Sequence, residues 1–327
     1  MKDELKIVTP KIFIGKKNKG RYATNTKFFT DEVSLENITR FFDGVLVSHE
    51  LILSKTAELY DPLGFASPLK VFGNHIARRA LIESNGNPLR EVSQLFLQYV
   101  YQIKMLDTLT FKRKKYDIAP AETDVLILMT DAGYEASIMI LYLGHQTEEG
   151  MKLEFIFSVG NLNNTSSNIP RHELDIIERG SKQCERILDW LASKIERKIM
   201  ISDSKVALSW IRNPNLRTQP FVQARVHNIC KVFASTEAFY IRSDNNPSDL
   251  GTKFNKFVDT FLLLDEVSRF RNGPPCLQKG LEAAVTTGEL IPLSQITLNA
   301  EEKAMAALEV VKLNQLVILD NDGEDTM

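Results

Sequence analysis

The sequence has little cysteine and no long apolar run, and these two absences narrow the class of protein. Its three cysteines, Cys184, Cys230 and Cys276, are far apart among 327 residues and form no Cys-x-x-Cys pair. They favour neither a disulfide framework nor a zinc site, so we expect a reducing, intracellular compartment, with no preference between cytoplasm and nucleus. No run approaches the roughly 18–20 apolar residues that a membrane span needs, so no membrane partner is expected.

Several enzyme motifs are also missing. The sequence has no adjacent Asp-Asp pair, which a polymerase palm would need, and no Asp-Thr-Gly or Asp-Ser-Gly turn, which an aspartic protease would need. It also lacks the His/His/Cys/Cys zinc module of an integrase. We therefore expect the chain to be neither a polymerase, a protease nor an integrase.

The composition is that of an ordinary globular protein. Apolar residues make up 43% and charged residues 25%, so a sizeable core can form, and the length allows about two domains. The formal net charge is −2, so bulk charge gives no sign of a nucleic-acid binder. Any basic surface must be local.

Strand-like and helix-like segments alternate in the middle of the chain. An apolar run at 125–129 and similar segments at 136–143 and 153–159 predict three strands. Later segments predict a helix at 172–193, a strand at 199–202, helices at 204–211 and 218–233, a strand at 238–242, and a helical stretch that starts near 246. This order predicts an α/β fold, a mixed five-stranded sheet with helices on its faces. Two further helices are expected from about 67 and 87, after a turn at 61–64.

Four carboxylates fall at the ends of these elements. Asp131 ends the first strand, Glu173 lies in the first turn of the long helix, Asp203 ends the fourth strand and Asp249 opens the last helical stretch. Strand ends and helix starts at one edge of such a sheet line a common crevice. Four acids there would repel one another, and Mg²⁺, which prefers carboxylate ligands, relieves that repulsion. Taken singly, each acid is explained equally well as a cap, turn or first-turn residue.

Four stretches together resemble the ribonuclease H domain of the BEL/Pao group of retrotransposons. They are Leu-Met-Thr-Asp-Ala at 128–132, Ile-Pro-Arg-His-Glu-Leu at 169–174, the segment 201–211 and the segment 244–253. Residues 57–68 are similar to the part of these polyproteins that joins the polymerase to the ribonuclease H domain. The resemblance implies a smaller, mostly helical thumb or connection region at 1–118 and a ribonuclease H-like domain at 119–258, followed by a C-terminal extension at 259–327. The acidic residues at the end of this extension predict a disordered tail.

The resemblance also implies an activity. A member of this group would use two Mg²⁺ ions, for which Mn²⁺ can substitute, to cleave the RNA strand of RNA:DNA hybrids internally. Asp131 would bridge both ions, Glu173 and Asp203 would share one, and Asp249 would complete the other. A separate chain could supply the missing polymerase palm. The alternative is a catalytically inactive retrotransposon remnant, or a co-opted module that binds nucleic acid or protein.

The sequence departs from many ribonucleases H in one respect. No histidine lies between His227 and the end of the chain, so the histidine that often precedes the fourth acid is missing. General acid–base help is worth roughly 10²–10⁴-fold, so a slow enzyme is compatible with the sequence. A hybrid duplex would be held through phosphates and 2′-hydroxyls. Candidates for these contacts, each equally explained as a solvated surface residue, are Lys205, Arg212, Arg217, Arg242 and Lys253.

Overall fold

The computed structural model describes most of the chain between residues 46 and 310. The described residues are 4–5, 17–18, 21–22, 46–82, 90–106, 111–112, 123–164, 166–190, 195, 197–215, 218–254 and 263–310. Arg217 and the acidic tail therefore lie outside the described residues. Among the helices that are described, none has both the length and the apolar character to span a bilayer.

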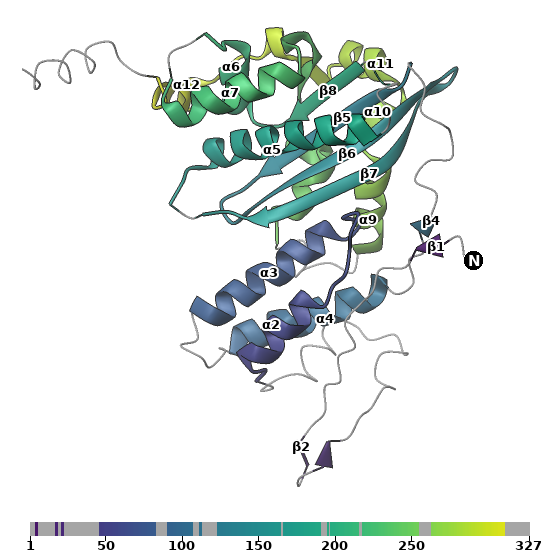
Figure 1. The fold of residues 1–327 in the computed structure, drawn as a ribbon, viewed down its shortest axis with the longest axis vertical. Coiled ribbons are helices and arrows are strands. Elements are labelled where there is room, and N and C mark those ends of the chain that lie inside the picture. Colours follow the sequence, from purple (N-terminus) through teal and green to yellow (C-terminus); the bar gives the residue numbers. More distant parts are fainter. Residues whose placement is uncertain are drawn as a thin grey trace, which may run out of the picture.

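A mixed six-stranded sheet forms the centre of the protein (Figure 1), in the order β10-β9-β8-β5-β6-β7. Its strands are β5 (Val125–Ala132), β6 (Ala136–Thr147), β7 (Gly150–Leu162), β8 (Arg197–Ser202), β9 (Ala238–Ile241) and β10 (Leu290–Pro292). Strands β5, β6 and β7 form an antiparallel meander, and β8 and β9 run parallel to β5. The predicted mixed α/β sheet is confirmed, with one strand more than expected, because β10 pairs antiparallel with β9.

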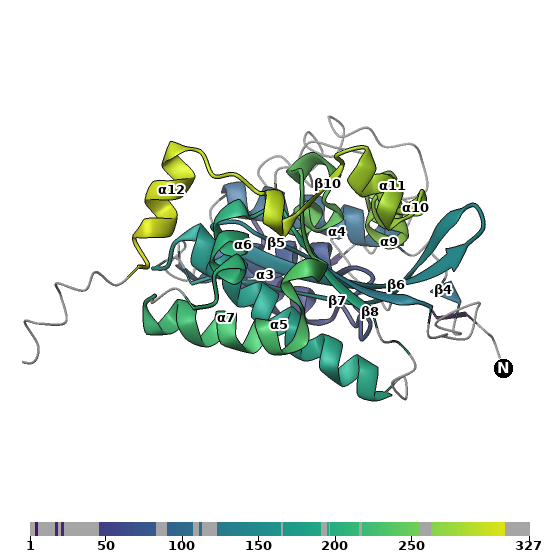
Figure 2. The same ribbon diagram turned by 90° about the horizontal axis from the view of Figure 1, so that it is seen from above.

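Three helices cover one face of the sheet. They are α5 (Ile169–Trp190), α6 (Lys205–Arg212) and α7 (Pro220–Val232). The apolar stripe of α5, which includes Leu174, Ile177 and Cys184, is fully buried against the sheet, because these positions repeat at helical spacing. Near the C-terminal end of the described chain, α12 (Ala300–Ala307) packs against α6 (Figure 2).

The opposite face is covered by helices from both ends of the chain. From the N-terminal side comes α3 (Ser67–Ile82), against which α2 (His49–Ala57) and α4 (Arg90–Leu106) pack; from the C-terminal side come α9 (Leu263–Asn272), α10 (Pro275–Gln278) and α11 (Leu281–Thr286). One continuous apolar cluster joins Phe72 of α3, Phe96 of α4 and Phe270 of α9 to Ile127 and Tyr142 of the sheet. The N-terminal helices thus share a core with the sheet, and the expected domain limits remain a prediction.

The expected turn at 61–64 attaches these N-terminal helices to the edge strand β7. The Asp61 carboxylate accepts backbone N–H bonds from Gly64, Phe65 and Ala66 at 2.6–3.0 Å, which closes the turn before α3. Gly64 has φ +80° and its carbonyl accepts a hydrogen bond from the Ser158 hydroxyl of β7 at 2.8 Å. Only glycine adopts this backbone conformation without strain, so the turn depends on Gly64.

The remaining described elements are short. Two pairs of two-residue strands join β1 (Glu4–Leu5) to β4 (Phe111–Lys112) and β2 (Lys17–Asn18) to β3 (Arg21–Tyr22). Four 3₁₀ helices, η2 (Ser235–Glu237), η3 (Ser243–Asn245), η4 (Pro247–Gly251) and η5 (Leu293–Gln295), connect the larger elements. The segments η3 and η4 lead from β9 to the acidic end of the sheet, where the functional residues lie.

Candidate active site

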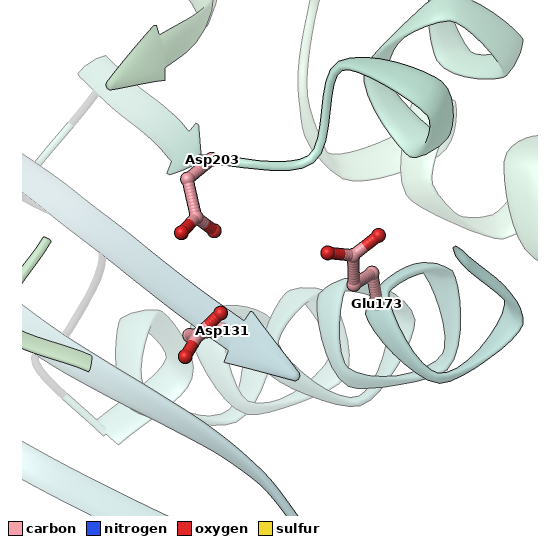
Figure 3. Close-up of side chains that lie close together, drawn as sticks. All are labelled: Asp131, Glu173 and Asp203. Carbon is pink, nitrogen blue, oxygen red and sulfur yellow. The ribbon is translucent and has the colours of Figure 1, made fainter. Parts of the chain in front are cut away.

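Three of the four predicted acids meet at one end of the sheet. Asp131 lies near the end of β5 and Asp203 directly follows β8; because Thr130 pairs with Ser202 in the parallel register, these two acids leave neighbouring strands side by side. Glu173 reaches toward them from α5. One carboxylate oxygen from each residue lies within 4.8 Å of the other two, and Figure 3 shows the three side chains facing one another.

The helix that carries Glu173 begins earlier than predicted. The expected start at 172 would place Glu173 in the first turn, but α5 begins at Ile169. The Asn168 side chain accepts the backbone N–H of Arg171 at 3.0 Å, as an N-cap residue does, and Pro170 suits the first turn. Glu173 therefore lies one turn inside the helix, and its position is set by packing rather than by the helix end.

Neighbouring hydroxyl groups hold two of the acids in place. The Thr252 hydroxyl donates to the Asp131 carboxylate, and the Ser204 hydroxyl donates to the Glu173 carboxylate. Ser204 is also the N-cap residue of α6, where its oxygen accepts the backbone N–H of Ala207 at 3.1 Å. These hydroxyl contacts were not predicted from the sequence. Only Ser204 could have been recognised, because it stands between a strand and a helix, where serine is a favoured N-cap residue.

Asp203 has an oxygen that a cation would satisfy. Its Oδ1 atom is buried and has no hydrogen-bond partner among the described residues. A buried carboxylate oxygen without a donor is costly, and such atoms in a folded protein mark a site for an ion or a water molecule. Together with the oxygens of Asp131 and Glu173 it forms an all-carboxylate set, which suits hard divalent cations such as Mg²⁺. The residues present therefore fit a divalent metal ion.

The electrostatics of the three acids lead to the same conclusion. Burial raises the pKa of Glu173 well above its usual value, and the charges of Asp203 and Asp131 add to this. Burial, followed by the charge of Asp131, raises the pKa of Asp203 to about 8. Burial also raises the pKa of Asp131, and it outweighs the hydrogen bond from Thr252, which lowers this pKa. Three ionised carboxylates are thus unfavourable here without a counter-charge, and a divalent cation would supply one.

Asp249, the fourth predicted acid, lies beside this group but is not one of the three whose oxygens converge. It is buried in η4, where its Oδ1 accepts a hydrogen bond from the Ser243 hydroxyl at 2.9 Å and lies 2.5 Å from the Lys253 ammonium. Its charge still raises the pKa of Asp131 and of Asp203. The structure therefore places all four acids in one neighbourhood, with the fourth already paired to a cation.

The predicted nucleic-acid contacts are in different situations. The Arg212 guanidinium donates to the Ile296 carbonyl at 2.8 Å, so it holds the C-terminal segment. The Lys205 ammonium lies 3.8 Å from Glu302. Arg242 forms a surface ion pair with Asp244 at 3.4 Å and keeps 74% of its side chain in solvent. Arg217 lies outside the described residues, and the nucleic-acid role of each residue stays a prediction.

The stretch that lacks the expected histidine is also ordered. Asp244, which stands where that histidine would fall, lies in η3 with 81% of its side chain exposed. Its carbonyl accepts a hydrogen bond from Arg269 of α9. This contact ties the segment before Asp249 to the C-terminal helices.

Comparison with known protein families supports this interpretation of the geometry. Residues 48–204 match the family model of the Pao retrotransposon-like RNaseH-like domain. The matched range contains Asp131, Glu173 and Asp203 and ends before Asp249. A search among curated proteins found no match to the chain. With a mixed sheet flanked by helices and three acids gathered at its end, the chain carries an RNase H-like domain of the Pao retrotransposon type.

Proposed function

We propose that the chain is a retroelement ribonuclease H that hydrolyses the RNA strand of RNA:DNA hybrids with Mg²⁺. The observation that carries this proposal is the convergence of Asp131, Glu173 and Asp203 within 4.8 Å, with one buried oxygen of Asp203 left without a donor. The RNase H-like family supports a nucleic-acid substrate and a divalent metal. Mn²⁺ prefers similar oxygen ligands and is expected to substitute.

The chain's own residues hold and orient the site. Asp131, Glu173 and Asp203 would bind the metal, which when present activates a water molecule and stabilises the leaving oxygen of a phosphodiester. The hydroxyls of Thr252 and Ser204 donate to the first two acids, which fixes their carboxylates and favours their ionised forms. The buried strands β5 and β8 keep the site rigid, as a site of this precision requires.

The substrate would be held by shape and charge. An RNA:DNA hybrid offers phosphates and 2′-hydroxyls, and Arg242, whose ion pair with Asp244 is exposed to solvent, would contact a phosphate. A reverse-transcriptase palm on a separate chain would extend this contact surface. We propose that residues 1–118 act as the connection to such a palm and that residues 259–327 form a C-terminal extension.

A cleavage assay tests the proposed function. The purified chain is incubated with end-labelled RNA:DNA hybrid in Mg²⁺, in Mn²⁺ and in EDTA, beside Asp131→Asn and Asp189→Asn. Asp189 is exposed near the end of α5 and serves as the matched control. Cleavage of the RNA strand by the wild type and by Asp189→Asn, but not by Asp131→Asn or in EDTA, is the expected result.

Two other results would overturn the proposal. Equal cleavage by Asp131→Asn and the wild type would assign the activity to another site. No cleavage by the wild type in either metal would leave the alternative, an inactive module, and hybrid binding measured by fluorescence anisotropy would then show whether it binds nucleic acid.

A further inference from the structure

Lys253 reaches into the acidic end of the sheet and pairs with its most buried acid. Lys253 stands four residues after Asp249, one turn further along the chain, and its Nζ atom lies 2.5 Å from Asp249 Oδ1. The same ammonium donates to the Ser243 hydroxyl at 3.3 Å, and that hydroxyl donates to Asp249 Oδ1 at 2.9 Å. The carboxylate side chain is only 5% exposed, whereas the lysine side chain is 48% exposed. The lysine side chain thus extends inward from the surface and places its ammonium group beside a buried carboxylate.

The charge of Lys253 acts on the metal-binding acids as well. Burial lowers the pKa of Lys253, but the hydrogen bond and the charge of Asp249 raise it, and the charges of Asp131 and Asp203 raise it further. The net effect is a raised pKa, which keeps the ammonium charged. In turn Lys253 lowers the pKa of Asp131. The ammonium therefore belongs to the same electrostatic group as the four acids, and it forms its ion pair with Asp249.

The balance of charge limits how many metal ions this group accepts. Four carboxylates against one ammonium leave the group strongly negative. One divalent ion nearly balances it, whereas a second divalent ion beside the ammonium would give an excess of positive charge. Like charges a few ångströms apart in a partly buried site repel strongly, so the second ion is disfavoured while the ammonium stays.

We propose that Lys253 is a tethered cation that takes the place of a second divalent ion in the free protein. The three convergent acids then hold one ion, and Asp249 stays with Lys253 instead of completing a second site. This inference rests on the proposed function, because it assumes that Asp131, Glu173 and Asp203 bind a divalent metal. It makes Lys253 a residue that sets metal stoichiometry, where the sequence suggested only a contact to nucleic acid.

Counting bound Mn²⁺ tests the inference without any measurement of cleavage. Free Mn²⁺ is followed by electron paramagnetic resonance during titration of the full chain near neutral pH. The wild type is expected to bind one ion tightly, and Lys253→Gln is expected to bind a second with at least about tenfold higher affinity than the wild type does, since the repelling charge is gone. Lys253→Arg keeps the charge and is expected to bind as the wild type does.

Another lysine of the chain offers a matched control. Lys182 of α5 forms the same type of pair with Glu178, four residues apart at 2.8 Å, and here too the lysine side chain is largely exposed whereas the carboxylate is mostly buried. Lys182→Gln removes one positive charge from the protein but none from the acidic end of the sheet. It is expected to leave Mn²⁺ binding unchanged, and circular dichroism spectra confirm that each variant is folded.

The outcomes separate this inference from the proposed function. If Asp131→Asn binds the first Mn²⁺ as tightly as the wild type, the metal site itself is wrong and both claims fail. If Asp131→Asn loses the first ion but Lys253→Gln binds no more Mn²⁺ than Lys182→Gln, only the role of Lys253 is wrong. A wild type that already binds two ions with equal affinity would overturn that role as well.

Discussion

Replacing Asp203 with asparagine should make the metal-free protein more stable, although it removes a proposed metal ligand. Burial and the charge of Asp131 raise the pKa of Asp203 from 3.8 in the unfolded chain to about 8 in the folded protein. The folded form therefore holds this proton more tightly than the unfolded form does. By linkage, stability falls as the pH rises from about 4 to about 8 and no longer depends on this group above that range.

The pKa shift sets the size of the effect. A shift from 3.8 to about 8 corresponds to an upper limit of about 6 kcal/mol, because one pKa unit is worth about 1.4 kcal/mol. Asp203 keeps part of its surface in solvent, which screens charges, so we expect a gain of about 2–3 kcal/mol for Asp203→Asn at pH 8. In a domain of this size such a gain raises the Tm by roughly 5–10 °C.

Thermal unfolding of the wild type, Asp203→Asn and the exposed control Asp189→Asn in EDTA measures the difference. The Asp203→Asn variant should melt above the wild type at about pH 8 and close to it at about pH 4–5. Saturating Mg²⁺ should close the gap, because a ligand at about 100 times its Kd stabilises the wild type by about 2.7 kcal/mol. A variant that is no more stable than the wild type at pH 8, or a gap of equal size at both pH values, would refute the reasoning.

Two structural contacts give further predictions. Glu309 is buried and its carboxylate accepts two hydrogen bonds from Arg171 at 2.8 Å, so Glu309→Gln should cost about 3 kcal/mol of stability, whereas Glu301→Gln, on an exposed side chain, should have little effect. Equal melting temperatures for these two variants would contradict a stabilising pair. Gly64→Ala should cost at least about 2–3 kcal/mol in urea unfolding, because Gly64 has φ +80° and a Cβ atom there would lie 1.9 Å from the Ser158 carbonyl oxygen. An unchanged urea midpoint would show that this turn is not constrained.

The parts of the fold that could be predicted are those with long, regular patterns. The apolar run at 125–129 and the stripe along α5 each extend over enough residues for their spacing to identify the element and its buried face. Strand β10 has only three residues, too few for an alternating pattern to be recognised. Its place in the sheet comes from pairing with β9, about fifty positions earlier in the chain, which no local pattern encodes.

The site shows the same limit. Asp131 and Asp203 could be placed together because strand ends of a parallel pair share an edge, and β5 and β8 are such a pair. The state of Asp249 depends on Lys253, and a spacing of four residues does allow an ion pair. The sequence cannot tell, however, whether that lysine turns toward the acid or toward a ligand, because the choice depends on how η4 packs against the sheet.

The acids of the site also depend on a segment far outside the family match. Glu309 holds Arg171, two residues before Glu173 in α5, and the Ala306 carbonyl accepts the indole N–H of Trp210 in α6. Glu173 lies in α5, and Ser204, whose hydroxyl donates to the Glu173 carboxylate, is the N-cap residue of α6. One C-terminal segment therefore holds both helices that carry this contact. Since the family match ends at residue 204, the matched range alone lacks β9, β10 and Asp249 as well as this segment. The geometry of the acids is therefore a property of the fold through residue 310 rather than of the matched domain alone.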